Sequence, residues 1–239
     1  LFFYSSVQVN PRILNWGSLH IVYRGIEMDL TSKQIKNLSH SKWYHATLKR
    51  HLPSLLKGIK VDFNLGHELD FGAGFYITSD FQQAQKYINR LVEFLNANNA
   101  SSKFLGNVDE EGIILEFELT DFPSIFTTSK YKCHYFNSHK ASNDVIDFAE
   151  FVFQNRLRST ELIHQFDFIY GVQTDDNPTG LLQKYKAGMV SKADVLEEFR
   201  KPFSFKQLSI HNQDFCDIMK VNKIYLSEDG KELDQWQKL

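Results

Sequence analysis

Apolar and polar residues recur with two different periods along this chain, and these periods predict short strands and helices. The clearest predicted strand is 113–119, where apolar side chains alternate with other residues. The clearest predicted helix is 81–95, which follows a Thr78-Ser79-Asp80 cap. The residues expected on its inner side, at helical spacing, are Ala84, Tyr87, Ile88, Leu91 and Leu95.

Shorter patterns predict the rest of the fold. Strands are expected at 19–24, 43–47, 75–77, 166–172, 203–210 and 224–226, the last of these ending the folded part. Helices are expected from the Thr31 capping box to Leu38 and at 48–57, 143–158, 181–187, 192–200 and 212–219, with a polar loop at 96–106. Because strands and helices mix without a regular β–α–β alternation, the sequence predicts an α+β fold rather than a doubly wound parallel sheet.

Composition narrows the class of protein. The chain has 239 residues, a length that allows one large domain or two small ones, and 42% of them are hydrophobic, which is ample for a buried core. Its net charge of −2 provides no overall basic field for nucleic acid. Cys133 and Cys216 lie far apart, which disfavours a disulfide framework and favours a reducing, cytoplasmic compartment. No apolar run is long enough to cross a membrane, the opening residues make a poor signal peptide, and no histidine cluster predicts a metal.

Two segments carry the candidate chemistry: Trp43-Tyr44-His45-Ala46-Thr47 and Asp70-Phe71-Gly72-Ala73-Gly74-Phe75-Tyr76-Ile77-Thr78. The first is typical of a strand that ends by presenting His45. The second is typical of a glycine-hinged loop entering a strand that presents Tyr76. Single histidines and tyrosines on strands are usually packed polar residues. Together on neighbouring strand ends, however, an imidazole and a phenol can hold a flat, polar, positively charged ring such as the nicotinamide of NAD.

These segments resemble the small ADP-ribosyltransferase-like domains, mainly bacterial and often toxins, that carry a "YHGT … DFGxGFYxT … QA" pattern. The matching residues are Tyr44 to Thr47, Asp70 to Thr78, and Gln83-Ala84. Looser matches follow in order: Phe151-Val152 with Asn155-Arg156, Phe166 to Val172 with Asp175-Asp176, Tyr185 with Gly188, and Gln207 to His211, which resembles "QxSFHT". The resemblance spans about residues 43–220, and residues 1–40 find no counterpart.

The resemblance implies a split antiparallel sheet around an NAD cleft, with flanking helices. It divides the chain into an N-terminal appendage (1–40), a catalytic domain (41–228) and a C-terminal tail (229–239). Within the His-Tyr branch of this superfamily, His45, Tyr76 and Gln207 take the three catalytic positions. His45 would bind a ribose hydroxyl and Tyr76 would stack on nicotinamide. Gln207 replaces the usual glutamate, so it could bind a ribose hydroxyl but could not act as a base.

The same resemblance implies a set of residues that bind NAD as a substrate: His45, Ala46, Thr47, Gly72, Gly74, Phe75, Tyr76 and Arg156. The backbone of Ala46 would hold the nicotinamide amide, at a position where the family usually has glycine. Arg156 could bind the pyrophosphate, or it could form an ion pair with Glu150 or Asp147 on its own helix. The region around the first motif is locally basic. Such a run is either a solvated face or a surface that attracts phosphate or nucleic acid. Its residues are Lys42, Lys49, Arg50, Lys57 and Lys60.

The expected function is NAD-dependent mono-ADP-ribosyl transfer to a macromolecular acceptor, protein or nucleic acid, with release of nicotinamide. Family membership would make the protein a toxin or defence effector with an antitoxin or immunity protein as partner, and no membrane partner. Two alternatives stay open: an NAD glycohydrolase, and a catalytically silent nucleotide- or partner-binding module, which the Gln207 and Ala46 departures favour. Transfer to an RNA 2′-phosphate is weaker, because the expected arginine pair is not evident.

Overall fold

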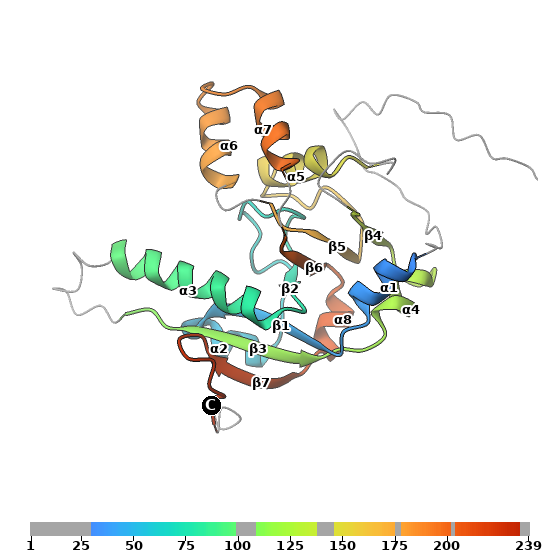
Figure 1. The fold of residues 1–239 in the computed structure, drawn as a ribbon, viewed down its shortest axis with the longest axis vertical. Coiled ribbons are helices and arrows are strands. Elements are labelled where there is room, and N and C mark those ends of the chain that lie inside the picture. Colours follow the sequence, from blue (N-terminus) through green and yellow to red (C-terminus); the bar gives the residue numbers. More distant parts are fainter. Residues whose placement is uncertain (1–29, 99–108, 138–145, 175–177, 202–203, 235–239) are drawn as a thin grey trace, which may run out of the picture.

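The computed structural model describes residues 30–98, 109–137, 146–174, 178–201 and 204–234. Within them the chain is a mixed α+β protein, as the sequence predicts, and its strands form two separate sheets (Figure 1). The predicted strand at 19–24 and the pair Asp175-Asp176 lie outside the described residues. Every helix in the described ranges is too short or too polar to cross a lipid bilayer.

The first sheet is antiparallel and has the order β1-β3-β7. Its strands are β1 (Lys42–Leu48), β3 (Gly112–Glu118) and β7 (Val221–Leu226). The long helix α3 (Phe81–Asn98) lies along one face of this sheet, and the core of the protein lies on the other (Figure 1). Both faces of β3 are therefore buried, including Ile114 and Glu116, although an alternating pattern is typical of a strand with one exposed face.

The second sheet is mixed and has the order β2-β6-β5-β4. Its strands are β2 (Phe75–Ile77), β4 (Cys133–Tyr135), β5 (Phe168–Val172) and β6 (Lys206–Ile210). The pairs β2–β6 and β5–β6 are antiparallel, whereas β4 runs parallel to β5, so the expectation of a wholly antiparallel core is wrong at this edge. The strand β4 was not predicted from the sequence.

The two sheets meet at one point. Tyr44 of β1 and Thr78, just after β2, exchange two backbone hydrogen bonds of 2.8 and 3.0 Å, and the two strands pair nowhere else within the described residues. The sheet is thus split beside both sequence motifs, which places His45 and Tyr76 on either side of the split.

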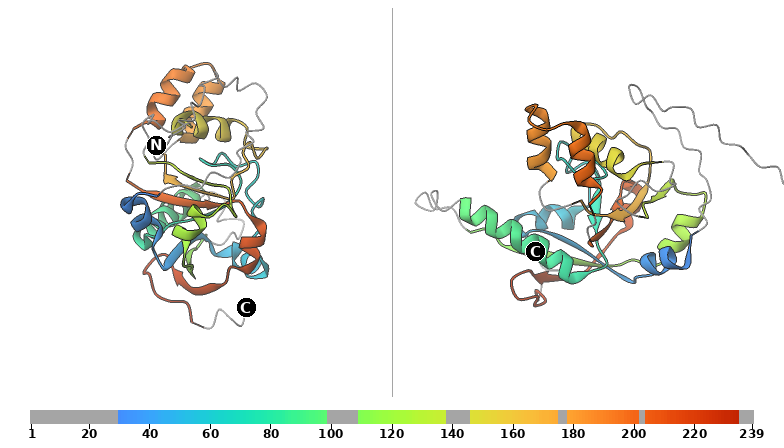
Figure 2. Two further views of the ribbon diagram at one scale, coloured as in Figure 1. Left: turned by 90° about the vertical axis from the view of Figure 1, so that its right-hand side faces the viewer. Right: turned by 45° about the horizontal axis from the view of Figure 1, so that its top comes forward.

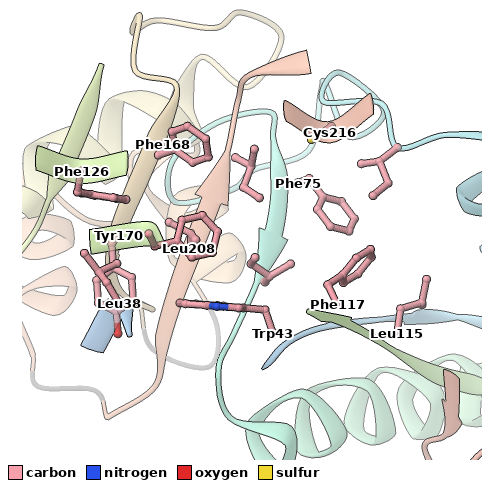
Figure 3. Close-up of a cluster of buried hydrophobic side chains, with 14 of the residues drawn as sticks. Leu38, Trp43, Phe75, Leu115, Phe117, Phe126, Phe168, Tyr170, Leu208 and Cys216 are labelled. Carbon is pink, nitrogen blue, oxygen red and sulfur yellow. The ribbon is translucent and has the colours of Figure 1, made fainter. Parts of the chain in front are cut away.

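The main core fills the space between the sheets (Figure 3). Trp43, Phe75, Phe117, Phe168 and Leu208 are buried there, one from each of five strands. Short helices close the sides of this core: α1 (Ser32–Leu38), the 3₁₀ turn η1 (Lys49–His51) leading into α2 (Leu52–Lys57), α4 (Phe122–Thr127) and α8 (Gln213–Ile218). The Thr31 capping box begins α1 as predicted, and Leu38 is fully buried in the core, so this part of the predicted appendage packs onto the domain.

A second core lies under the remaining helices, α5 (Phe148–Leu157), α6 (Pro178–Lys186) and α7 (Lys192–Phe199), which gather at one end of the molecule (Figure 2). It includes Phe71 of the glycine loop, so this loop is part of the hydrophobic core. The helix α5 begins later than predicted, because Asp147 caps it through the Glu150 N–H. The turn at Gly188 separates α6 from α7 as predicted.

Candidate functional site

His45 lies at the split between the sheets. Its Nδ1 is 2.8 Å from the Tyr76 carbonyl oxygen, and its ring stacks on Phe75 with centroids 4.3 Å apart. A carbonyl oxygen only accepts, so Nδ1 carries the proton and Nε2 is left as an acceptor. Burial lowers the pKa of His45 to about 4, although the bond to Tyr76 opposes this shift, so the imidazole is neutral at pH 7.

The same contact explains why the sheet splits. After the Tyr44–Thr78 pair, a continued ladder would next join Ala46 to Tyr76. The Tyr76 carbonyl instead accepts from the His45 ring, and the ladder stops. The chain thus uses one imidazole to end a strand pairing.

Ala46 is left with an open backbone edge. The bonds Lys49 N–Glu111 O and Leu119 N–Ser41 O, 2.8 and 3.0 Å, show that odd-numbered residues of this segment face β3. Even-numbered residues alternate with them and face the other way. The N–H and C=O of Ala46 therefore both point toward the split, where they form an adjacent donor and acceptor.

The Tyr76 side chain folds back onto its own glycine loop. Its hydroxyl accepts from the Phe71 N–H at 3.0 Å and donates to the Gly72 carbonyl at 2.7 Å, and its ring lies nearly parallel to that of Phe71. Burial and the charge of Asp70 raise the pKa of Tyr76 well above its ordinary value, so the phenol stays protonated. The hydroxyl shapes the loop, and the ring remains partly exposed.

Two buried histidines hold the other carbonyls of the loop. His211 Nδ1 donates to Ala73 O at 2.6 Å, and His164 Nε2 donates to Phe71 O at 2.8 Å. Burial lowers the pKa of both, to about 4 for His164, so both are neutral donors. Asn64 pairs with the N–H and C=O of Gly74 at 3.0 and 2.8 Å, as a neighbouring strand would. The loop is therefore rigidly positioned.

The glycines of the loop are required by space. Gly72 has φ +77°, and a Cβ there would lie 2.9 Å from Asn155 Oδ1. A Cβ on Gly74 would lie 2.7 Å from the His211 ring. The predicted sharp turn is present at Gly72, while Gly74 allows His211 to approach the backbone.

Asp70 is the centre of a buried polar network behind the loop. Its Oδ1 accepts from Arg156 Nε and Nη2 at 2.8 and 2.6 Å and from Thr174 Oγ1 at 2.6 Å, and its Oδ2 accepts from Thr174 N at 3.0 Å. Burial opposes ionisation of Asp70, but Arg156 and the Thr174 hydrogen bonds outweigh it and hold its pKa below the ordinary value. Arg156 also donates to the Glu68 carbonyl.

This network corrects one sequence interpretation. Arg156 does form an ion pair, but neither partner predicted on its own helix is right. Glu150 pairs with Lys192 and Asp147 with Arg200, whereas Arg156 reaches Asp70, 86 residues away. With its guanidinium engaged by Asp70, Thr174 and Glu68, Arg156 acts as a support for the loop, and the pyrophosphate role stays a prediction.

Gln207 of β6 joins the same network. Its Nε2 donates to Asp70 Oδ2 at 2.8 Å and to Val172 O at 3.4 Å. In the β2–β6 register Tyr76 lies opposite Ser209, so Gln207, two residues along, is on the same face as Tyr76. Asp70 thus connects the second and third predicted catalytic positions.

A small pocket opens on the His45 side of the split. His45, Thr47, Gly74 and Phe75 line it, and they are joined by residues from the segment after β1: His51, Ser54, Leu55, Gly58, Lys60, Phe63 and Asn64. Ala46, Gly72, Tyr76, Gln207 and Arg156 do not line it. Most predicted site residues therefore form two groups, joined by the His45–Tyr76 contact. The pocket group is His45, Thr47, Gly74 and Phe75, and the network group is Tyr76, Arg156 and Gln207.

The basic run near the first motif is largely neutralised. Ion pairs join Lys42 to Glu116, Lys49 to Glu111, Arg50 to Glu110 and, at 3.9 Å, Lys60 to Asp217. These pairs favour the solvated-face interpretation over a phosphate- or nucleic-acid-binding surface.

Tyr87 does not lie where its helical spacing predicts. It was predicted on the inner side of α3, but 51% of its surface is exposed, whereas Ala84 and Ile88 are buried. Tyr87 lies one helical turn after Gln83, whose side chain donates to the Lys206 carbonyl at the start of β6. This exposed ring on α3 is therefore a further candidate for ligand contact.

A family model described as "Protein of unknown function (DUF3990)" matches residues 55–221, well over half of the chain. The chain belongs to this family. The matched span includes Tyr76, Tyr87, Arg156 and Gln207 and begins after His45 and Ala46. No curated protein and no solved structure matches the chain.

Proposed function

We propose that this protein is an NAD-dependent mono-ADP-ribosyltransferase that acts at the split between its two sheets. The observation that carries the proposal is the open edge at Ala46. A backbone N–H and C=O, side by side and free of the β3 ladder, match the C=O and N–H of a carboxamide. Nicotinamide is a flat aromatic ring that bears this group.

The groups around that edge suit the rest of NAD. His45 Nε2 is a neutral acceptor beside Ala46, so it can receive a hydrogen bond from a ribose hydroxyl. Tyr76 offers a partly exposed aromatic ring beside the split and Tyr87 an exposed one on α3, and such rings favour stacking with a cationic pyridinium. These features support a ligand that combines carboxamide, aromatic ring and sugar.

These contacts support the following proposed reaction. The bond from the ribose carbon C1 to the nicotinamide nitrogen breaks, and neutral nicotinamide leaves with the bonding electron pair. An acceptor nucleophile forms the new bond to C1 and loses its proton. The protein contributes by holding the nicotinamide and the ADP-ribose part of NAD in a fixed geometry. Among the described residues, Asp70 has both carboxylate oxygens engaged by Arg156, Thr174 and Gln207, so it is not free to act as a base, and an acceptor that is itself a good nucleophile suits this site.

The test follows NAD labelled in its adenine half, with purified protein, with and without cell lysate. A transferase leaves label on a macromolecule and releases nicotinamide. Label found only in free ADP-ribose identifies a glycohydrolase instead, and no cleavage under either condition contradicts both enzymatic proposals and favours a binding module.

A matched pair of variants on α3 sharpens this test. Tyr87→Ala should reduce NAD cleavage about 5- to 150-fold, because base–aromatic stacking of this kind is worth about 1–3 kcal/mol. Phe94→Ala removes another exposed aromatic side chain from the same helix and should leave cleavage unchanged. Equal activity of the two variants would remove Tyr87 from the site.

A further inference from the structure

The orientation of the Gln207 amide is set by its neighbours. Asp70 Oδ2 and Val172 O are both acceptors, and both receive hydrogen bonds from Gln207 Nε2. Neither could receive a bond from Oε1, so a flipped amide would place two acceptors against each other. The side chain is only 8% exposed, which leaves it little freedom to turn.

We infer that Asp70 is a positioning residue that turns Gln207 so that only Oε1, a neutral hydrogen-bond acceptor, faces the ligand. This inference rests on the proposed function in one respect, the identity of that ligand. An outward acceptor selects a hydroxyl donor, such as a ribose hydroxyl, and adds no charge to the site. The side chain at position 207 is thus a neutral acceptor, which suits a place where Asp70 already supplies a negative charge.

The charge balance explains why an amide suits this position. Asp70 is 3% exposed and its charge is compensated by one cation, Arg156. A carboxylate at position 207 would lie about where Nε2 does, 2.8 Å from Asp70 Oδ2, and within the described residues Arg156 is the cation paired with Asp70. Two carboxylates this close share a proton, so the carboxyl introduced by Gln207→Glu would titrate well above an ordinary glutamate.

The variant Gln207→Glu tests this arrangement through a pH profile. Protonated, the new carboxyl can donate to Asp70 and imitate the amide. Once ionised, it is repelled. When a carboxyl has a higher pKa in the folded than in the unfolded protein, the folded state is most stable at low pH, where the carboxyl is protonated. That stability is lost as the pH rises through the raised pKa. We expect the melting temperature of Gln207→Glu to fall below that of wild type by at least about 4 °C more at pH 8 than at pH 5.5.

Gln207→Met is the matched control, because it has similar length, makes neither hydrogen bond and cannot titrate. Its deficit in melting temperature should be the same at both pH values. A deficit of Gln207→Glu that is equally independent of pH, or a glutamate variant as stable as wild type at pH 8, would overturn the inference. These stability readouts need no NAD, so failure of the proposed function alone would leave them unchanged.

A measurement on the wild-type side chain covers the case in which Gln207→Glu does not fold at either pH. In a protein labelled with ¹⁵N-glutamine, the side-chain NH₂ signal missing from Gln207→Met identifies Gln207. Its protons should exchange with D₂O at least tenfold more slowly than those of the exposed Gln82. Exchange as fast as that of Gln82 would show that Nε2 is not held by Asp70 and would overturn the inference.

Discussion

The two sides of the sheet split differ in how their polar groups are satisfied. On the network side, Asp70, Arg156, Thr174 and Gln207 bond to one another, and the carbonyls of the glycine loop are held by His164, His211 and Asn64. On the pocket side, His45 keeps a free Nε2 among the described residues, and the Ala46 edge has no strand partner. A ligand needs protein groups that can still form hydrogen bonds, so the proposed site uses His45 Nε2 and the Ala46 edge on the pocket side and Gln207 Oε1 on the network side.

The residues of the two sequence motifs have different roles. In the glycine-loop segment, Asp70, Gly72 and the Tyr76 hydroxyl are needed to build the loop. In the first segment, His45 and Ala46 both build the split and leave atoms open beside it. Substitutions on the network side should therefore change stability first, while those on the pocket side should change ligand binding first.

The largest expected effect on stability is that of Asp70→Ala. It leaves the Arg156 guanidinium buried without its ion-pair partner, and breaking a buried pair in this way costs about 3–5 kcal/mol of unfolding free energy. Chemical denaturation measures it. The exposed pair Arg158–Glu161 supplies the control, since Glu161→Ala should hardly change stability. Similar values for the two variants would show that the network does not support the fold.

A smaller effect is expected from Gly72→Ala compared with Gly188→Ala. Both glycines have positive φ, +77° and +72°, so both substitutions cost about 1–2 kcal/mol of backbone strain. A Cβ at Gly188 meets open space, whereas one at Gly72 meets Asn155, which adds about 1–3 kcal/mol of overpacking. Equal unfolding free energies for the two variants would contradict the close packing behind the loop.

The smallest of these effects concerns pH. The pKa of His164 in the folded state is about 4, below its ordinary value of 6.5, so the unfolded chain binds more protons between these values. The contribution of neutral His164 to the free energy of unfolding is thus complete above about pH 6.5 and falls as the pH drops toward 4, by at most about 3 kcal/mol. In His164→Gln, the unfolding free energy from denaturation curves should decline less steeply over this pH range. Because His211 lies 4.6 Å away with a lowered pKa of its own, part of the decline should persist, and an unchanged slope would contradict the assignment.

Local patterns in the sequence predicted most elements, since β1, β2, α1 and the α6–α7 break follow from alternation, caps and glycine. They missed α4 and β4, which are too short to show a period. The burial of Tyr87 was predicted wrongly because helical spacing shows which side of α3 is apolar but not how much of that side the sheet covers. Arg156 was paired wrongly because its partner is distant in sequence. The open Ala46 edge depends on the strand register, which a single strand cannot reveal.

Recognition of a carboxamide at the open Ala46 edge is tested most directly by comparing cleavage of NAD with that of nicotinic acid adenine dinucleotide, by wild type and by Ala46→Pro. The variant removes an N–H that faces away from β3, so the strand should tolerate it, whereas Thr47→Pro removes a ladder N–H and should unfold the protein. Wild type should cleave NAD at least tenfold faster than the acid analogue, because only a carboxamide donates to the Ala46 carbonyl. A folded Ala46→Pro should lose most of this activity. Equal cleavage of the two dinucleotides, or full activity in the variant, would contradict recognition at the open edge.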